Sequence, residues 1–324
     1  MSNFKDGFSK SINNIGGISG SFEGTGYASN VQTAIDDAIH SLKTEATHRE
    51  NVSADYLKGW LAEQWHAETL KVNGQARGEN DIWANVSGNN RPGEDIIYGN
   101  SDISKIAEVK YYKTGSDTAK AVSRPEYTGK EKIIPSDQKE DIQEAAQRLS
   151  DKNIINRPEQ SANYQDTANH SNDRLEVDNV TSKPLNEITA KEMAKDFKKN
   201  HDINSDKYGL NTESFVEWSD IARQSGEAAL HAAALSAALT AAPHIWATLR
   251  EYIDNGEINS DTLLKRGASI LHGAETAGLR GGIAAALTAT CKTGLMGDSL
   301  KSISPVAIGM ATTMTINVIN YSIQ

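Results

Sequence analysis

A change in the spacing of apolar residues limits what the first half of this chain can fold into. Apolar side chains recur at the helical spacing over residues 31–48 and again over about 54–73, where Ser53 is placed to cap the second helix. Three short runs rich in β-branched and aromatic residues follow, bounded by turn residues: 81–86, 95–98 and 105–112. This succession predicts two helices and three consecutive strands, and therefore a mixed α/β fold.

The same domain is expected to continue beyond the three strands. A short apolar run at 132–135 predicts a fourth strand, and Ser136 is placed to cap a helix over about 137–150. We therefore expect an α/β domain over residues 31–150, with a mixed sheet flanked by helices.

Composition separates the remaining regions from this domain. Glycine, serine and asparagine dominate residues 1–30, which predicts a flexible amino-terminal arm. Residues 151–212 are largely polar and predict a linker, with one short charged helix at about 187–199. Residues 213–324 are rich in alanine, glycine, leucine and threonine, which predicts a separate all-α unit.

The helical unit admits more than one interpretation. Residues 228–249 and 302–324 contain no Lys, Arg, Asp or Glu, and a helix of about 20 residues spans a bilayer. The runs are nevertheless rich in small and hydroxyl residues, which favours closely packed helices. We expect a homo-oligomerisation or docking module over residues 213–324. Membrane association and a pore-forming toxin are the alternatives.

Charge and cysteine content bear on partners and location. The formal net charge of −10 disfavours a surface covered with nucleic acid. Residues 105–139 nevertheless hold eight Lys and Arg against five Asp and Glu, as expected either for a solvated surface or for a phosphate-binding track. The candidate nucleic-acid contacts in this segment are Lys113, Lys120, Arg124, Lys130 and Lys132. A lone cysteine, Cys291, excludes an intrachain disulfide and predicts a cytoplasmic protein, with attachment to the inner membrane as the alternative.

The strand expected at 105–112 carries the most informative side chains. Alternation places Glu108 and Lys110 on one face, and Asp95, at the start of the preceding strand, can face Glu108. Two carboxylates that lie this close repel unless a cation sits between them. The pattern predicts a Mg²⁺ site with an ammonium group beside it.

The preceding helix adds Glu63, with His66 three residues later. A helix with an inward glutamate, a β-meander, an aspartate and then Glu-x-Lys resembles the PD-(D/E)XK, or restriction-endonuclease-like, nuclease superfamily over residues 54–150. The matching positions are Glu63, Asp95, Glu108 and Lys110. The resemblance implies a restriction-endonuclease-like core. It also implies Mg²⁺, replaceable by Mn²⁺, on Asp95, Glu108 and Glu63, and cleavage of phosphodiesters in DNA rather than RNA.

Three accessory positions qualify this hypothesis. Pro92 is separated from Asp95 by two residues, so Glu94 is a rival metal ligand. Gln138 is a candidate phosphate or metal-water contact, although a surface or capping role is more common for a glutamine at a helix start. His66 is a candidate proton shuttle, but we favour a packing role. The alternative functions are a non-catalytic membrane or scaffold protein, or a toxin with a nuclease domain.

Overall fold

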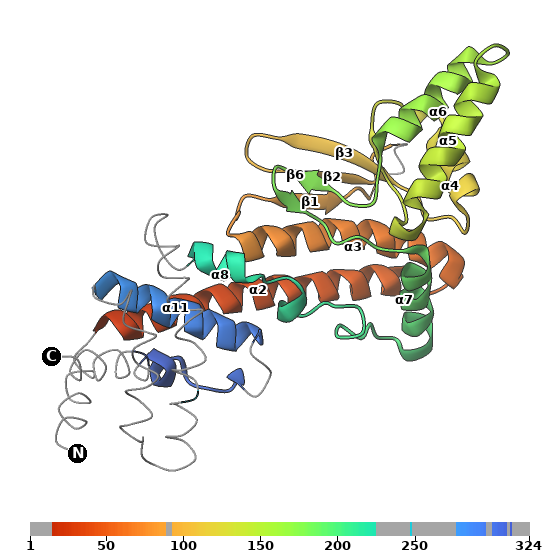
Figure 1. Ribbon diagram of the computed structural model, residues 1–324. Helices are drawn as coiled ribbons and strands as arrows, with labels where there is room; N and C mark the ends of the chain where they lie inside the picture. The colour runs from red at the N-terminus through yellow and green to blue at the C-terminus, as the bar shows by residue number, and fades with distance from the viewer. Residues whose placement is uncertain are drawn as a thin grey trace, which may run out of the picture. The chain divides into compact units, whose positions relative to one another are not determined.

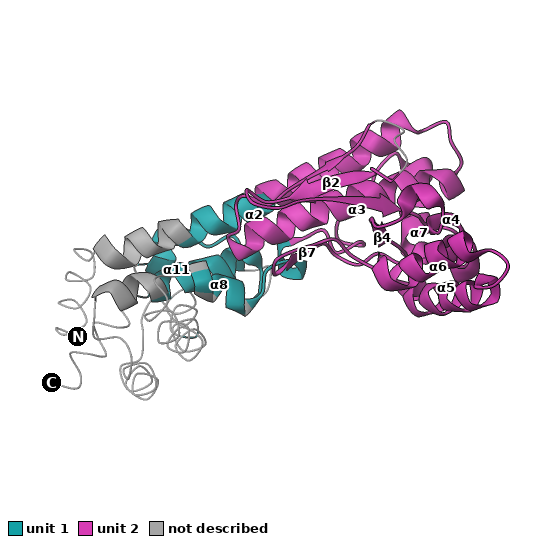
Figure 2. Cartoon of the chain, turned by 90° about the horizontal axis from the view of Figure 1, so that it is seen from above, with its two compact units in different colours: residues 1–32, 212–324 teal, residues 33–211 magenta. Residues whose placement is uncertain are grey.

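The chain divides into two compact units. In the computed structural model the described residues are 15–88, 93–224, 247, 277–295, 300–309 and 312. One unit comprises residues 33–211, and the other comprises residues 1–32 together with 212–324 (Figure 2). The α/β domain and the expected linker therefore belong to one unit, so the predicted boundary at residue 150 is wrong.

A five-stranded mixed sheet forms the centre of the larger unit (Figure 1). Its strands lie in sequence order: β1 (Trp83–Val86), β2 (Ile96–Gly99), β3 (Ser104–Val109), β4 (Glu131–Ile133) and β5 (Ser171–Asn172). The first three are antiparallel, as expected of a meander, whereas β4 and β5 join in parallel. The mixed α/β class and the three consecutive strands are thus confirmed.

Helix α3 (Ala54–Arg77) packs against the meander. Its buried side chains include Leu57, Leu61 and Trp65. Ser53 occupies the N-cap position, but its side chain makes no capping hydrogen bond. The helix continues past the expected stop at Gly74, where a side chain would meet the Cβ of Ile82 at 2.8 Å. It ends at Gly78, which adopts a φ of 75°.

Helices α4 (Gly115–Val122) and α5 (Lys139–Asn153) pack against each other (Figure 1). The sequence did not predict α4, which is only eight residues long. The two helices share an apolar core with the residue after β4: Ala119, Val122, Ile134, Ile142, Ala145 and Ala146. Ser136 begins a 3₁₀ turn, η2 (Ser136–Gln138), rather than the α-helix itself.

The expected polar linker is wrong, because residues 151–212 fold as part of the sheet domain. They form α6 (Pro158–His170), strand β5, a hairpin of β6 (Glu176–Val177) and β7 (Val180–Thr181), and the charged helix α7 (Glu187–Asn200). Buried hydroxyl groups account for part of the polar composition. Ser150 and Ser161 bond each other, and Ser123 bonds Thr167 at 2.8 Å, so these polar residues satisfy one another inside the domain.

The expected flexible arm is helical from residue 15 onward, and its residues 1–14 lie outside the described residues. Helix α2 (Ile15–His48) begins within it and continues through the helix expected at 31–48. Gly24 shows why one of the glycines in this segment lies inside a helix. Its missing side chain lets α2 approach α11 (Ala277–Thr293) within the smaller unit. A Cβ at Gly24 would lie 2.2 Å from the carbonyl oxygen of Ala285.

The described elements of the smaller unit are helical and include α8 (Trp218–Gln224). The run 228–249, except Ala247, and residues 313–324 lie outside the described residues. Within the part of the chain that is described, no helix combines the length and the apolar character needed to cross a membrane.

Candidate active site

Asp95, Glu108 and Lys110 meet where β2 begins and β3 ends. The antiparallel register pairs Ile96 with Ala107, which places Asp95 opposite Glu108. Lys110 Nζ donates to Asp95 Oδ2 at 3.0 Å and forms a closer ion pair with Glu108 Oε1. The second anchor of Asp95 is the backbone N–H of Val109, 2.9 Å from the same Oδ2. The side-chain alternation expected from the sequence therefore describes the structure.

Glu108 is the least accessible member of this cluster. Its side chain is only 2% exposed, against 21% for Asp95 and 24% for Lys110. Burial raises the pKa of Glu108, although Lys110 acts in the opposite direction. Its Oε2 atom is buried and has no partner with full hydrogen-bond geometry among the described residues, although the neighbouring Tyr127 hydroxyl acts on this carboxyl as a donor and lowers its pKa. A buried acceptor without a well-formed hydrogen bond is costly unless a cation or a better-placed donor fills the position.

Lys110 carries a stabilised positive charge. Burial opposes that charge, but the carboxylates of Asp95 and Glu108 outweigh the effect and raise the pKa of Lys110 above its usual value. The ammonium group therefore remains protonated at neutral pH and cannot serve as a general base. It can pair with an anion or neutralise charge that develops nearby.

Glu63 belongs to the same electrostatic environment. It is half-buried on α3, and burial, followed by the negative charge of Asp95, raises its pKa to about 8. The Glu108 carboxylate acts in the same direction, while Lys110 opposes it. The four residues matched to the nuclease pattern are therefore close enough to influence one another's ionisation.

The donor set fits a hard divalent cation, although the geometry is not that of a closed metal site. No three His, Cys, Asp or Glu side chains among the described residues are grouped as a ready-made metal site. Lys110 instead supplies the positive charge between Asp95 and Glu108. The available ligands are carboxylate oxygens, which Mg²⁺ prefers, and the unpaired Oε2 of Glu108 is one of them.

Tyr127 is a neighbour that the sequence did not identify. It ends the 3₁₀ turn η1 (Pro125–Tyr127), and Lys110 Nζ lies 5.6 Å from the centre of its ring. Burial, followed by the charge of Glu108, raises the pKa of Tyr127 to about 12. A turn residue after a short helix carries no sequence signal for this contact, because only the tertiary fold brings it to β3.

His66 has the packing role that we favoured. Its Nδ1 lies 2.9 Å from Ser182 Oγ and its Nε2 lies 2.9 Å from the hydroxyl of Tyr111. The ring is fully buried, and this burial lowers its pKa to about 3, so the imidazole is neutral. Both ring nitrogens are thus engaged with Ser182 and Tyr111 and not with Asp95, Glu108 or Lys110. The proton-shuttle hypothesis is therefore not supported by the geometry.

Gln138 holds the backbone after β3, whereas Glu94 lies in the turn beside Asp95. The amide of Gln138 is buried and donates to the carbonyl oxygens of Tyr112 and Lys113 at 3.1 and 3.2 Å, so it holds the backbone after β3. Glu94 is half-buried in the turn before β2. The described contacts with Lys110 and with the Val109 N–H belong to Asp95, which makes Asp95 the better ligand candidate.

The candidate nucleic-acid contacts separate into two groups. Lys113, Lys120 and Arg124 are exposed around α4, and Lys130 is half-buried. Lys132 is fully buried, so its assignment as a nucleic-acid contact is wrong.

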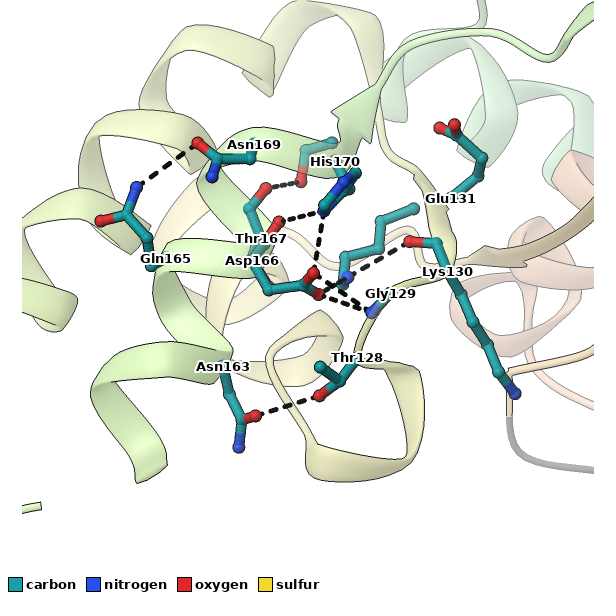
Figure 3. A network of polar contacts seen from close by, with 12 residues as sticks. Thr128, Gly129, Lys130, Glu131, Asn163, Gln165, Asp166, Thr167, Asn169 and His170 are labelled. Atoms are coloured by element: carbon teal, nitrogen blue, oxygen red, sulfur yellow. Dashed lines mark hydrogen bonds and ion pairs between the residues drawn. The ribbon is translucent and has the colours of Figure 1, made fainter. Parts of the chain in front are cut away.

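Lys132 is instead part of a polar network at the carboxyl end of α6. Its Nζ pairs with Asp166 Oδ2, and Asp166 also accepts the Gly129 N–H at 3.1 Å and lies 2.8 Å from His170 Nδ1 (Figure 3). Burial opposes the charge of Asp166, but Lys132 prevails and lowers the pKa of this carboxyl. The network ties β4 to α6 and explains why a lysine in this strand points inward.

Comparison with other proteins adds no assignment. No protein-family model, curated protein or solved structure matches this chain. The functional argument therefore depends on the chemistry and geometry of the cluster around Glu108.

Proposed function

We propose that the chain is a Mg²⁺-dependent phosphodiesterase that cleaves DNA. The observation that carries the proposal is the cluster of Asp95, Glu108 and Lys110, in which a buried carboxylate keeps one oxygen unpaired. Glu63 supplies a third carboxylate within electrostatic range. Carboxylates of this kind with an adjacent ammonium suit a reaction in which negative charge develops on a phosphate.

The order of elements supports a restriction-endonuclease-like core. A long helix is followed by an antiparallel meander, then by a short helix and a strand parallel to β3. This arrangement puts Asp95 and Glu108 on neighbouring strands and Glu63 on the preceding helix, in agreement with the PD-(D/E)XK resemblance. We include the superfamily assignment in the proposal.

Each side chain has a distinct part in the proposed reaction. Asp95 and Glu108, with Glu63, would hold Mg²⁺, and a bound Mg²⁺ lowers the pKa of its water and neutralises phosphate charge. Lys110 would pair with a phosphate oxygen, because its raised pKa keeps it protonated. Glu63 must lose its proton before it can ligate a cation, so its pKa of about 8 makes cation binding dependent on pH.

The smaller unit is proposed to assemble subunits, and a bacterial defence or restriction-type role is consistent with such an effector. The close approach at Gly24 shows that some of the small residues in this unit pack within the chain. Self-association would therefore use other residues of the segment 213–324.

Cleavage of plasmid DNA by the full chain tests the enzymatic proposal. We expect nicking or linearisation in Mg²⁺ and no reaction in EDTA. Asp95→Asn and Glu108→Gln should each abolish cleavage. Asp102→Asn, at an exposed aspartate in the turn between β2 and β3, should not. Full activity of both site variants would exclude this assignment.

A further inference from the structure

Tyr112 stands out as an exposed aromatic residue beside the proposed site. Its side chain is 43% exposed, although it lies only two residues beyond Lys110. The neighbouring Tyr111 points the other way, since its hydroxyl donates to the carbonyl oxygen of Leu185 at 2.9 Å and contacts His66. Lys110 N–H donates to the Ile133 carbonyl oxygen at 3.0 Å and so continues the pairing of β3 one residue past its end at Val109; the same alternation carried on to Tyr112 would put its ring opposite that of Tyr111, on the side of Glu108 and Lys110.

The backbone that carries Tyr112 is fixed on both sides. Gln138 Nε2 donates to the carbonyl oxygens of Tyr112 and Lys113, while its Oε1 accepts from Thr118 Oγ1 at 3.2 Å. Two residues after Tyr112, Thr114 caps α4 by accepting the Asp117 N–H at 3.2 Å. A buried glutamine amide is thus fully engaged in holding a segment whose aromatic ring faces solvent. Such preorganisation reduces the entropy lost when a ligand binds the ring.

We infer that Tyr112 is a stacking platform for an unpaired nucleobase next to the phosphate that is cleaved. The inference rests on the proposed function and specifies its substrate class. An exposed ring beside a phosphate site offers a face to any base, whereas bases inside a duplex already stack on both sides. Exposed Lys113 follows directly and can contact the adjoining phosphate. The substrate is therefore a strand with an unpaired nucleotide at the cleaved position, as in a single strand, an overhang or a flap.

Binding of short oligonucleotides tests this inference. Oligonucleotides that carry 2-aminopurine are titrated into the full chain with Glu108→Gln, which prevents turnover, using single-stranded DNA, single-stranded RNA and duplex DNA. We expect single strands to bind more tightly than the duplex and the 2-aminopurine fluorescence to be quenched. Tyr112→Ala and Tyr112→Leu should each weaken single-strand binding about tenfold or more, while Tyr112→Trp should retain it.

Two controls separate stacking from other effects. Tyr56→Ala alters a more exposed tyrosine, 73% accessible at the start of α3, and should leave binding and quenching unchanged. The dependence of affinity on salt should be the same for Tyr112→Ala as for the parent, because no phosphate contact is removed, whereas Lys113→Ala should reduce that dependence.

The outcomes distinguish this inference from the proposed function. If the wild-type chain cleaves DNA but Tyr112→Ala binds and quenches like its parent, the stacking role is wrong and the nuclease assignment stands. Tighter binding to duplex than to single strands would also overturn the inference. If the wild-type chain neither binds nor cleaves any of these nucleic acids in Mg²⁺, both are wrong.

Discussion

Replacing Lys110 by methionine should make the stability of the larger unit depend on Mg²⁺. Lys110→Met keeps much of the side-chain length but leaves Asp95 and Glu108 without the ammonium that now lies between them. Removing one partner of a fully buried ion pair costs about 3–5 kcal/mol. Because Lys110 and Asp95 are each more than a fifth exposed, water reduces the penalty, and we expect about 1–2 kcal/mol at pH 7.5.

A divalent cation should reverse this loss, because it can replace the missing charge. Binding to the folded state alone adds about 2.7 kcal/mol when the ligand concentration is 100 times its dissociation constant. Mg²⁺ should stabilise the wild type less, since Lys110 competes for the same carboxylates.

Urea unfolding monitored by tryptophan fluorescence, with Mg²⁺ or with EDTA, measures both effects. Lys120→Met provides a matched control, because Lys120 is exposed on α4. It should change neither the stability nor the response to Mg²⁺. The reasoning is refuted if Lys110→Met is as stable as the wild type in EDTA, or if Mg²⁺ stabilises both proteins equally.

Three further outcomes follow from individual contacts. His66 is neutral when folded, with a pKa of about 3, so unfolding takes up a proton at this residue below about pH 6.5. Lowering the pH from 8 to 5 should therefore cost the wild type about 2 kcal/mol more than it costs His66→Gln, as measured by urea titration of both proteins. Gly24→Ala should destabilise the chain by about 1–3 kcal/mol in thermal unfolding, because the new methyl group meets the Ala285 backbone, whereas Gly26→Ala, with open space around it, should not. Cleavage at limiting Mg²⁺ should rise as the pH passes through about 8, where Glu63 loses its proton, and a flat profile would argue against Glu63 as a ligand.

The sequence predicted the centre of the site better than its surroundings. Period-two alternation was enough to put Glu108 and Lys110 together, and a turn between adjacent strands was enough to bring Asp95 opposite. These relations are local to one meander. The contacts of Tyr127 with Lys110 and of Gln138 with the backbone after β3 arise only when separate helices pack, so no local pattern reveals them.

The errors have a common physical origin in polar residues that are buried together. Lys132 was expected at the surface, but Asp166 on α6 supplies its counter-charge inside the domain. Ser161 and Thr167 contributed to the polar composition that suggested a linker, although their hydroxyl groups bond those of Ser150 and Ser123 inside the domain. Composition shows how many polar residues a segment has. It does not show whether their side chains find hydrogen-bond partners inside the fold, because those partners are distant in sequence.

The most direct test of the central claim is the position of a bound cation in crystals of the full chain soaked in Mn²⁺, located by anomalous scattering. We expect a peak coordinated by Asp95 and by the now unpaired Oε2 of Glu108, with the ammonium of Lys110 displaced from between the two carboxylates. A fully occupied Mn²⁺ site elsewhere, with Lys110 still paired to both carboxylates, would contradict the metal-dependent mechanism.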